Sequence, residues 1–252
     1  MKSGKRPRAD CVRVRSARVH RFQSRLLAWF ECSARSFPWR RRRATLYQKV
    51  LAEVLLQRTR AEVVSNFLPP FLKCFPSWTS LARATEKDLA TLLRPLGLWR
   101  RRARALKKLA GELALRKGRF PRDRCAIESL PGVGQYIANA VLLFSHGQAE
   151  PLLDANMARV LERYFGPRTL ADIRYDPYLQ SLAHQVLQGT NATSLNWAIL
   201  DLAALVCTKP KPRCADCPLV RGCLYGRELL RSREMPPAVT PGSRLTQRAV
   251  PT

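Results

Sequence analysis

Apolar residues recur at intervals of three and four positions along most of the chain. In the first such stretch Phe22, Leu26 and Phe30 follow this spacing, which places their side chains on one face of a helix. Strand-like alternation with β-branched side chains is nearly absent. The sequence therefore predicts an all-α fold, with further helical stripes through residues 46–55, 63–68, 89–93, 103–115, 137–144, 157–164, 178–187 and 197–206.

Polar and proline-rich segments flank or interrupt these stripes. Residues 1–20 are basic and have little periodic apolar content, so we expect a disordered basic arm. Residues 233–252 are rich in proline and predict a disordered tail. Four consecutive arginines at 40–43 indicate an exposed link. Two consecutive prolines, Pro69 and Pro70, are expected to end the preceding helix, because proline lacks the backbone amide hydrogen.

The charge of the chain points to a polyanionic partner. Its 252 residues include 45 Lys and Arg against 18 Asp and Glu, a formal net charge of +27. Such an excess repels itself unless it is neutralised, so nucleic acid is the expected partner. No apolar run approaches the roughly 18 residues of a membrane span, and no membrane association is expected. We expect a cytoplasmic or nucleoid-associated protein in a reducing compartment, although the Arg-rich start also resembles a transit peptide.

A tight turn at residues 130–134 joins two helical stripes. Gly132 and Gly134 let the chain turn sharply and bring backbone amides close to a ligand. Amides beside the start of a helix bind anions, so Gly132, Val133 and Gly134 are predicted to contact a DNA phosphate. The alternative is an ordinary turn between helices. The backbone of this hairpin is also a candidate site for a monovalent cation.

Four of the eight cysteines lie close together, in the order Cys207-x6-Cys214-x2-Cys217-x5-Cys223. Four thiolates in one loop can hold a metal centre without histidine. Structural zinc sites pair two short cysteine knuckles, and only Cys214 and Cys217 form one. We therefore expect a [4Fe–4S] cluster, with zinc as the alternative and disulfides as a weaker one. The first loop of this site carries cations predicted to meet DNA phosphates, namely Lys209, Lys211 and Arg213.

Taken together, these motifs resemble the endonuclease III superfamily of helix-hairpin-helix DNA glycosylases. The hairpin, Asp154 twenty residues after Gly134 and the cysteine quartet have that family's order and spacing, and segments 37–39, 52–59 and 97–99 are similar too. The resemblance implies a six-helix barrel domain (46–164) that contains the hairpin. It also implies an iron–sulfur cluster domain built from residues 21–45 and 165–226. The active site is expected in the cleft between the two domains.

The resemblance assigns three catalytic candidates. Asp154 stands at the family's catalytic aspartate; it also suits a helix N-cap, where an ionised carboxylate can stabilise a sugar oxocarbenium ion. Tyr136 stands where the lyase members have lysine. Because a phenol forms no Schiff base, we expect a monofunctional enzyme with water as the nucleophile. Glu53 aligns with a glutamate that protonates the departing base or polarises water. The alternative for Glu53 is a surface ion pair with Lys49.

The expected substrate is double-stranded DNA with a mismatched or damaged base, bound by a monomer. Gln57 and Arg58 are predicted to fill the gap left by a flipped nucleotide or to read its partner base. Residues 134–136, 152–156 and 163–166 favour the branch that removes thymine or uracil opposite guanine. Members of the adenine branch usually have tyrosine at the position of Leu98 and a further C-terminal domain, for which the 29 residues after Cys223 are too few.

A third possibility is a non-catalytic DNA-binding module that keeps the hairpin and the cluster. The presence of both Glu53 and Asp154 argues against it.

Overall fold

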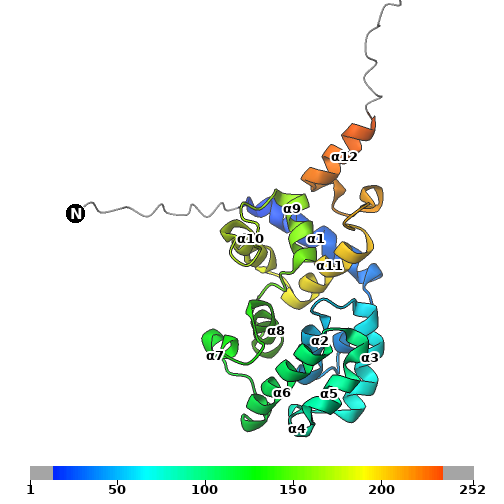
Figure 1. Cartoon of the computed structure of the whole chain (residues 1–252). Helices are drawn as coiled ribbons and strands as arrows, with labels where there is room; N and C mark the ends of the chain where they lie inside the picture. The colour runs from blue at the N-terminus through cyan, green and yellow to red at the C-terminus, as the bar shows by residue number, and fades with distance from the viewer. Residues whose placement is uncertain (1–13, 235–252) are drawn as a thin grey trace, which may run out of the picture.

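The computed structural model describes residues 14–234, and every regular element within them is a helix. The all-α prediction is thus confirmed. Figure 1 shows two bodies of helices, with α2–α8 in the lower body and α1 lying beside α9–α12 in the upper body. Within residues 14–234 no helix is both long and apolar enough to cross a membrane.

The lower body holds the first hydrophobic core. Leu51, Leu106 and Ile137 are fully buried in it, and α6 packs on α4 and α5 while α2 packs on α8. Its elements are η1 (Pro38–Arg40), α2 (Leu46–Leu56), α3 (Ala61–Cys74), α4 (Trp78–Arg83), α5 (Glu86–Leu92), η2 (Arg94–Leu96), α6 (Trp99–Leu115), α7 (Arg124–Glu128) and α8 (Gln135–His146).

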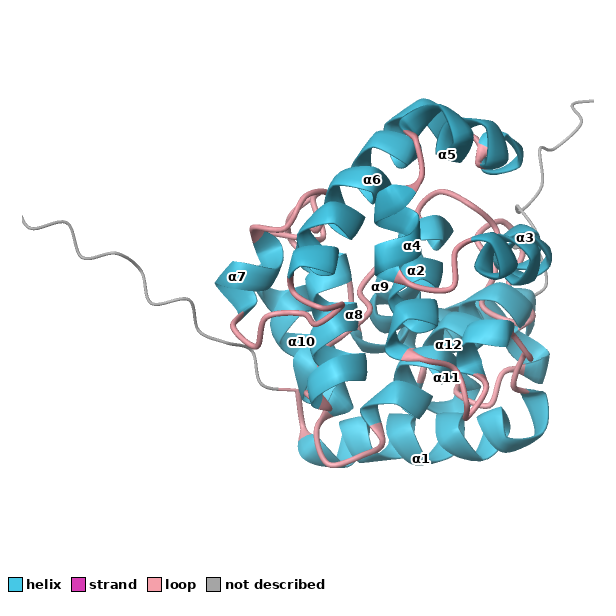
Figure 2. Cartoon of the chain, turned by 90° about the horizontal axis from the view of Figure 1, so that it is seen from below, coloured by secondary structure: helices cyan, strands magenta, loops and turns pink. Residues whose placement is uncertain are grey.

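The upper body holds a second core, in which α1 packs on α10 and α11. Phe22 of α1 lies 5.0 Å from the ring of Tyr164 and 5.2 Å from that of Phe165, both on α9. Figure 2 shows α1 along the edge opposite to α5 and α6. The elements of this body are α1 (Ser16–Ser33), α9 (Ala155–Phe165), α10 (Pro177–Leu187), α11 (Ala192–Leu205), η3 (Cys214–Asp216), η4 (Val220–Gly222) and α12 (Leu224–Glu234).

Both ends of the ordered chain differ from expectation. The predicted arm is wrong for residues 16–20, which begin α1, because Val19 is buried and extends the stripe of Phe22 and Leu26. Helix α12 runs to Glu234, one residue past the expected start of the tail. Residues 1–13 and 235–252, which hold the rest of the predicted arm and tail, lie outside the described residues.

The expected domain boundaries also differ from the packing. Met157 and Leu161 of α9, assigned by the resemblance to the barrel domain, are buried in the second core, because the apolar face of α9 packs on α11. Phe37 and Trp39, assigned to the cluster domain, are buried in the first core. Residues 37–39 therefore belong to the lower body and α9 to the upper body, and the catalytic candidates are found where these two bodies meet.

Helix α3 continues through Pro69 and Pro70, so the prediction that they end it is wrong. Each proline removes one backbone hydrogen bond. The buried face of the helix nevertheless continues across them, with Leu68 on one side and Phe71 on the other. Burial of Leu68 and Phe71 on either side of the prolines favours continuation of the helix.

The predicted hairpin joins α7 to α8. Gly132 has a φ of +75°, which an L side chain rarely adopts, and a Cβ atom there would lie 3.3 Å from Cβ of Ala105. Val133 is buried and anchors the turn, whereas Gly132 and Gly134 are exposed. Gly134 is the N-cap of α8. The turn thus presents its glycines outward and leads directly to Tyr136 in the first turn of α8.

Candidate active site

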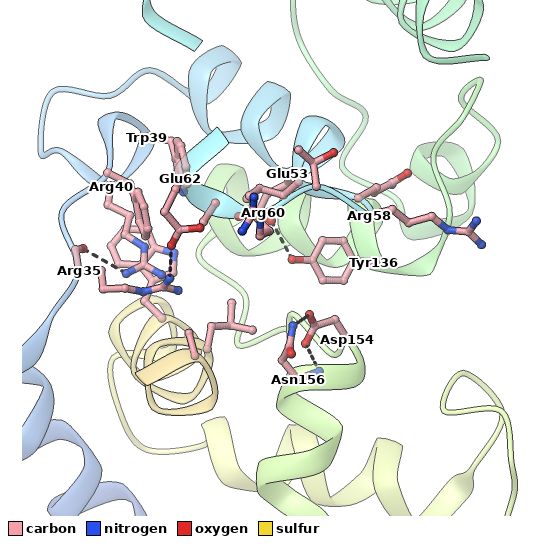
Figure 3. Close-up of a pocket in the computed structure, with 18 residues that line it drawn as sticks. Arg35, Trp39, Arg40, Glu53, Arg58, Arg60, Glu62, Tyr136, Asp154 and Asn156 are labelled. Carbon is pink, nitrogen blue, oxygen red and sulfur yellow. Dashed lines mark hydrogen bonds and ion pairs between the residues drawn. The ribbon is translucent and has the colours of Figure 1, made fainter. Parts of the chain in front are cut away.

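A cavity of about 630 Å³ lies at the junction of the two bodies. It brings together all three predicted catalytic residues, which come from α2, from α8 and from the start of α9. Figure 3 shows Tyr136 between Glu53 on one side and Asp154 on the other. Gln57 and Arg58 line the same cavity. The expectation that the site lies between the bodies therefore agrees with the geometry.

Glu53 is buried at the base of this cavity, with 2% of its surface exposed. It does not form the surface pair with Lys49; instead the Tyr136 hydroxyl donates a hydrogen bond of 2.8 Å to Oε2 of Glu53. Burial raises the pKa of Glu53 to about 7, and this rise is opposed by the Tyr136 hydrogen bond and the charge of Arg40. Near neutral pH this carboxyl group can therefore hold a proton and release it.

Asp154 occupies the opposite side of the cavity as the N-cap of α9, as predicted. Its Oδ1 accepts hydrogen bonds from the backbone amides of Asn156, at 2.9 Å, and Met157, at 2.8 Å. Its Oδ2 accepts a third, of 2.7 Å, from the Asn156 side chain. These three donors hold the carboxylate in place at the positive end of the α9 helix dipole. Asp154 therefore presents a stabilised negative charge to the cavity.

A wall of arginine and aromatic side chains completes the cavity, and sequence reasoning missed it. Arg40 belongs to the run expected to be an exposed link, yet its side chain is only 10% exposed. Its guanidinium binds Asp201 and lies over the rings of Phe37 and Trp197. The expected exposure is wrong for Arg40 because its partner lies 161 positions away. No local pattern could have indicated that pairing.

The rim of the cavity is formed by residues 57–60. Arg58 has a φ of +58°, an uncommon value for a residue with a side chain, and both Gln57 and Arg58 are exposed. Arg102 belongs to a run of three arginines at 100–102, a pattern typical of exposed surface, but its side chain is buried beneath this loop. Its guanidinium donates to the carbonyls of Leu55 and Gln57 and to the Thr59 hydroxyl. It therefore holds the rim loop in shape and is not available to DNA.

Comparisons with known proteins agree with this geometry. The model of the HhH-GPD superfamily base excision DNA repair proteins matches residues 51–176, a span that contains Glu53, Tyr136 and Asp154. The chain belongs to this superfamily. The thymine-DNA glycosylase of Aeropyrum pernix is 37% identical over 213 residues, which cover 82% of this chain and 95% of the relative.

Two further relatives of this HhH-GPD protein bear on its specificity. The structure of a thermostable thymine-DNA glycosylase superposes with a TM-score of 0.77 at 31% identity, covering 84% of this chain and 98% of the other. The human adenine DNA glycosylase is 32% identical over 225 residues, which cover 82% of this chain and 40% of the relative. The predicted superfamily is thus confirmed, and relatives with two different target bases share its fold.

The HhH-GPD protein gathers its four predicted cysteine ligands around one small cavity beside Arg163 and Tyr225. Burial, together with the smaller effect of charge on the other three cysteines, raises the pKa of the Cys217 thiol to about 12. Four thiolates this close require a positive centre to hold them. Among residues 14–234, however, no three His, Cys, Asp or Glu side chains are placed to hold a single metal ion together.

The predicted DNA-contact residues lie at the surface of the HhH-GPD protein except Val133, whose side chain is buried and anchors the hairpin. Lys209, Lys211 and Arg213 are exposed on the loop that leads into the cysteine cavity. Arg163 donates a 2.8 Å hydrogen bond to the carbonyl of Thr208 and so ties this loop to α9, whose first residue follows Asp154. The basic loop and Asp154, the predicted catalytic aspartate, are therefore attached to the same helix.

Proposed function

We propose that this protein is a monofunctional DNA glycosylase that releases thymine or uracil paired with guanine in double-stranded DNA. The observation that carries the proposal is the hydrogen bond from Tyr136 to Glu53, across the cavity from Asp154. Of the described residues that line this cavity, none is a lysine that could form a Schiff base with the sugar. Water is then the nucleophile.

The proposed reaction divides the work between the two carboxyl groups. The Tyr136 hydroxyl donates to Oε2 of Glu53, so Oε1 is the atom from which a proton passes to the departing base. As the bond between the base and C1′ breaks, positive charge grows on the sugar, and ionised Asp154 stabilises it. Water then adds to C1′ and loses a proton, which leaves an abasic site in an intact strand.

We further propose that Cys207, Cys214, Cys217 and Cys223 bind a [4Fe–4S] cluster. In such a cluster each cysteine binds a different iron, so the four sulfur atoms need not converge on one point. The cluster would fix the loop that carries Lys209, Lys211 and Arg213, which we assign to DNA phosphates. Purified protein should be brown; a colourless protein with one zinc and no iron would contradict this assignment.

DNA binding is proposed to begin at the hairpin, by a single subunit. The exposed backbone amides of Gly132 and Gly134 are suited to a phosphate, and the adjoining carbonyls to a monovalent cation. Gln57 and Arg58 are assigned to the space left by the flipped nucleotide and to its partner base. Because several cations would contact phosphates, affinity should fall on the order of a thousandfold between about 50 and 200 mM salt.

Adenine release is the second candidate, since the human adenine DNA glycosylase is 32% identical to this chain. The two functions are separated by incubating the protein with duplexes that contain G·T, G·U or A opposite 8-oxoguanine, and then cleaving abasic sites with alkali. We expect breaks in the G·T and G·U duplexes after alkali only. Cleavage confined to the adenine strand would replace the proposal, and failure on every duplex would support the non-catalytic module.

The absence of lyase activity has its own test. Borohydride should trap no covalent adduct with the unmodified enzyme. The Tyr136→Lys variant should form one, because its amine would stand beside the sugar. Efficient trapping by the unmodified enzyme would show that another amine attacks the sugar, and that Tyr136 does not make the protein monofunctional.

A further inference from the structure

Asp201 is a fully buried carboxylate at the junction of the two bodies. It belongs to α11, yet all its hydrogen bonds described here come from the segment before α2. The backbone amide and Nε of Arg35 donate to it at 3.0 and 2.7 Å. Nη1 and Nη2 of Arg40 donate at 2.7 and 3.1 Å. Asp201 therefore takes both terminal nitrogens of Arg40 in a fork arrangement.

This arrangement sets the position of Arg40 in the wall of the active-site cavity. The guanidinium carbon of Arg40 lies 5.0 Å from the ring centre of Phe37 and 5.2 Å from that of Trp197. These rings fix its plane, and Asp201 fixes its direction. Nε of Arg40 is buried without a hydrogen-bond partner, so the orientation depends on the two terminal nitrogens.

Arg40 and Glu53 line the same cavity but form no ion pair within 4.0 Å in the described part of the chain. The groups that act on Glu53 are Tyr136 from α8, Arg40 from η1 and Asp154 at the start of α9. Of these only Arg40 is a cation. Without another partner, a guanidinium facing a buried carboxylate would bind it directly and hold it ionised.

A purely structural role explains Asp201 poorly. Burying a carboxylate with two guanidinium groups carries a large desolvation cost, and apolar side chains would join two helices at least as well. Asp176 shows the structural case: it is equally buried, but it accepts hydrogen bonds from the backbone amides of Leu170 and Leu179 at the start of α10. Asp201 instead binds the one cation that acts on Glu53.

We propose that Asp201 is a positioning residue for base release, which holds Arg40 against Trp197 and so prevents it from pairing with Glu53 and keeping that carboxyl group ionised. Asp201 acts through Arg40 and does not touch the base. This inference rests on the proposed function, because it assumes that protonated Glu53 is the acid. It explains why the cavity contains a largely buried arginine that forms no ion pair with Glu53.

The test compares Asp201→Asn, Arg40→Gln and the double variant, with Asp176→Asn as the matched control. Single-turnover release of uracil from a G·U duplex is measured between about pH 5 and 9, after circular dichroism has shown that each variant is folded. Asp201→Asn should be at least about tenfold slower near pH 7.5, with its alkaline midpoint moved to lower pH, because freed Arg40 pairs with Glu53. Arg40→Gln should move the midpoint to higher pH.

The double variant decides whether Asp201 acts through Arg40. It should follow Arg40→Gln in midpoint and come within about threefold of it in rate, since the cation that Asp201 restrains is gone. Asp176→Asn should melt earlier but keep the wild-type midpoint. A double variant as slow as Asp201→Asn, or an Asp201→Asn midpoint equal to that of the wild type, would overturn the proposal.

Two further measurements keep the outcome clear. If Asp201→Asn does not fold, the Arg40→Lys variant replaces it. Because lysine cannot bind both oxygens of Asp201 as a fork, the lysine should pair with Glu53 and lower the alkaline midpoint. A midpoint at or above that of the wild type would count against the proposal. The pKa of Glu53 is also followed by carboxyl-carbon NMR in the free protein. Changes in this pKa among the variants test the positioning role without any turnover. A wild-type protein that is inactive on every duplex would refute the proposed function but not the placement of Arg40 by Asp201.

Discussion

Glu53 and Asp154, the two carboxyl groups predicted to be catalytic, lie in opposite surroundings within the cavity. Glu53 belongs to the first core and is 2% exposed, and burial raises its pKa to about 7. Asp154 is partly exposed at the start of α9, where it accepts hydrogen bonds from two backbone amides. Burial favours the neutral acid of Glu53, whereas a helix N-terminus interacts favourably with a negatively charged cap. The same functional group thus becomes a proton donor on one wall and a stabilising charge on the other.

The largest expected effect comes from removing the charge on the Asp154 wall. Asp154→Asn keeps the capping geometry but cannot stabilise a positive sugar, so single-turnover base release should fall at least about a hundredfold. Its melting temperature should stay near that of the wild type, because Asn caps helices almost as well as Asp. The Asp154→Ala variant should lose about 1 kcal/mol of unfolding free energy as well as activity. Asp176→Asn, which alters the cap of α10, should leave the rate unchanged. Retained activity in Asp154→Asn would mean that Asp154 acts only as the N-cap of α9 and not in catalysis.

On the other wall, Glu53→Gln removes the acid and leaves the hydrogen-bonded amide. We expect a loss of about a hundredfold in base release, the lower range for a general acid.

Folding raises the pKa of Glu53 from 4.5 to about 7, so the folded protein binds this proton more tightly than the unfolded chain does. Stability is therefore lost as pH rises from about 5 to 7. The difference in melting temperature between Glu53→Gln and the wild type should therefore shift in favour of the variant as pH rises from 5 to 8. The control variant Glu112→Gln, at an exposed position, should show no such change.

A smaller effect is expected from the hydrogen bond that joins α8 to this acid. Tyr136→Phe should slow base release several-fold, because a hydrogen bond to protonated, neutral Glu53 contributes about 0.5–1.5 kcal/mol. The Tyr136 bond lowers the pKa of Glu53, so the alkaline midpoint should move to higher pH. Tyr47→Phe is the matched control, since the Tyr47 hydroxyl binds the Phe75 carbonyl away from the cavity. An unchanged midpoint in Tyr136→Phe would mean that the bond does not act on Glu53 during the reaction.

The smallest effect concerns binding rather than chemistry. Replacing exposed Lys211 with alanine should lower the salt dependence of DNA affinity by about one counterion. The rate on fully bound duplex should stay the same, because Lys211 lies on the cysteine loop and not in the cavity. The comparison variant is Lys87→Ala, on the exposed face of α5. Equal salt slopes for both variants would remove the cysteine loop from the DNA interface.

Local patterns in the sequence predicted the elements that local physics controls. Helical periodicity located the helices, the two glycines located the hairpin, and Asp154 was predicted as an N-cap because a capping residue needs only the amides of its own helix. The resemblance to a family named Tyr136 and Glu53 as separate catalytic candidates, but it did not predict the hydrogen bond between them. The two residues lie 83 positions apart, and no local pattern indicates that contact.

The sequence did not predict features that depend on distant partners. Arg40 and Arg102 belong to arginine-rich runs typical of exposed surface, yet both are buried by contacts with residues more than forty positions away. Asp201 carries no motif at all. A buried ion pair is specified by the tertiary arrangement of both residues, so neither arginine differs locally from its exposed neighbours.

The pH dependence of base release by the unmodified enzyme tests the division between the two walls most directly. Single-turnover rates on a G·U duplex should be high in mildly acidic buffer and should fall as pH rises through about 7, where Glu53 loses its proton. Glu53→Gln should show no such fall. A wild-type rate that stays level or rises through this range would contradict the assignment of Glu53 as the acid.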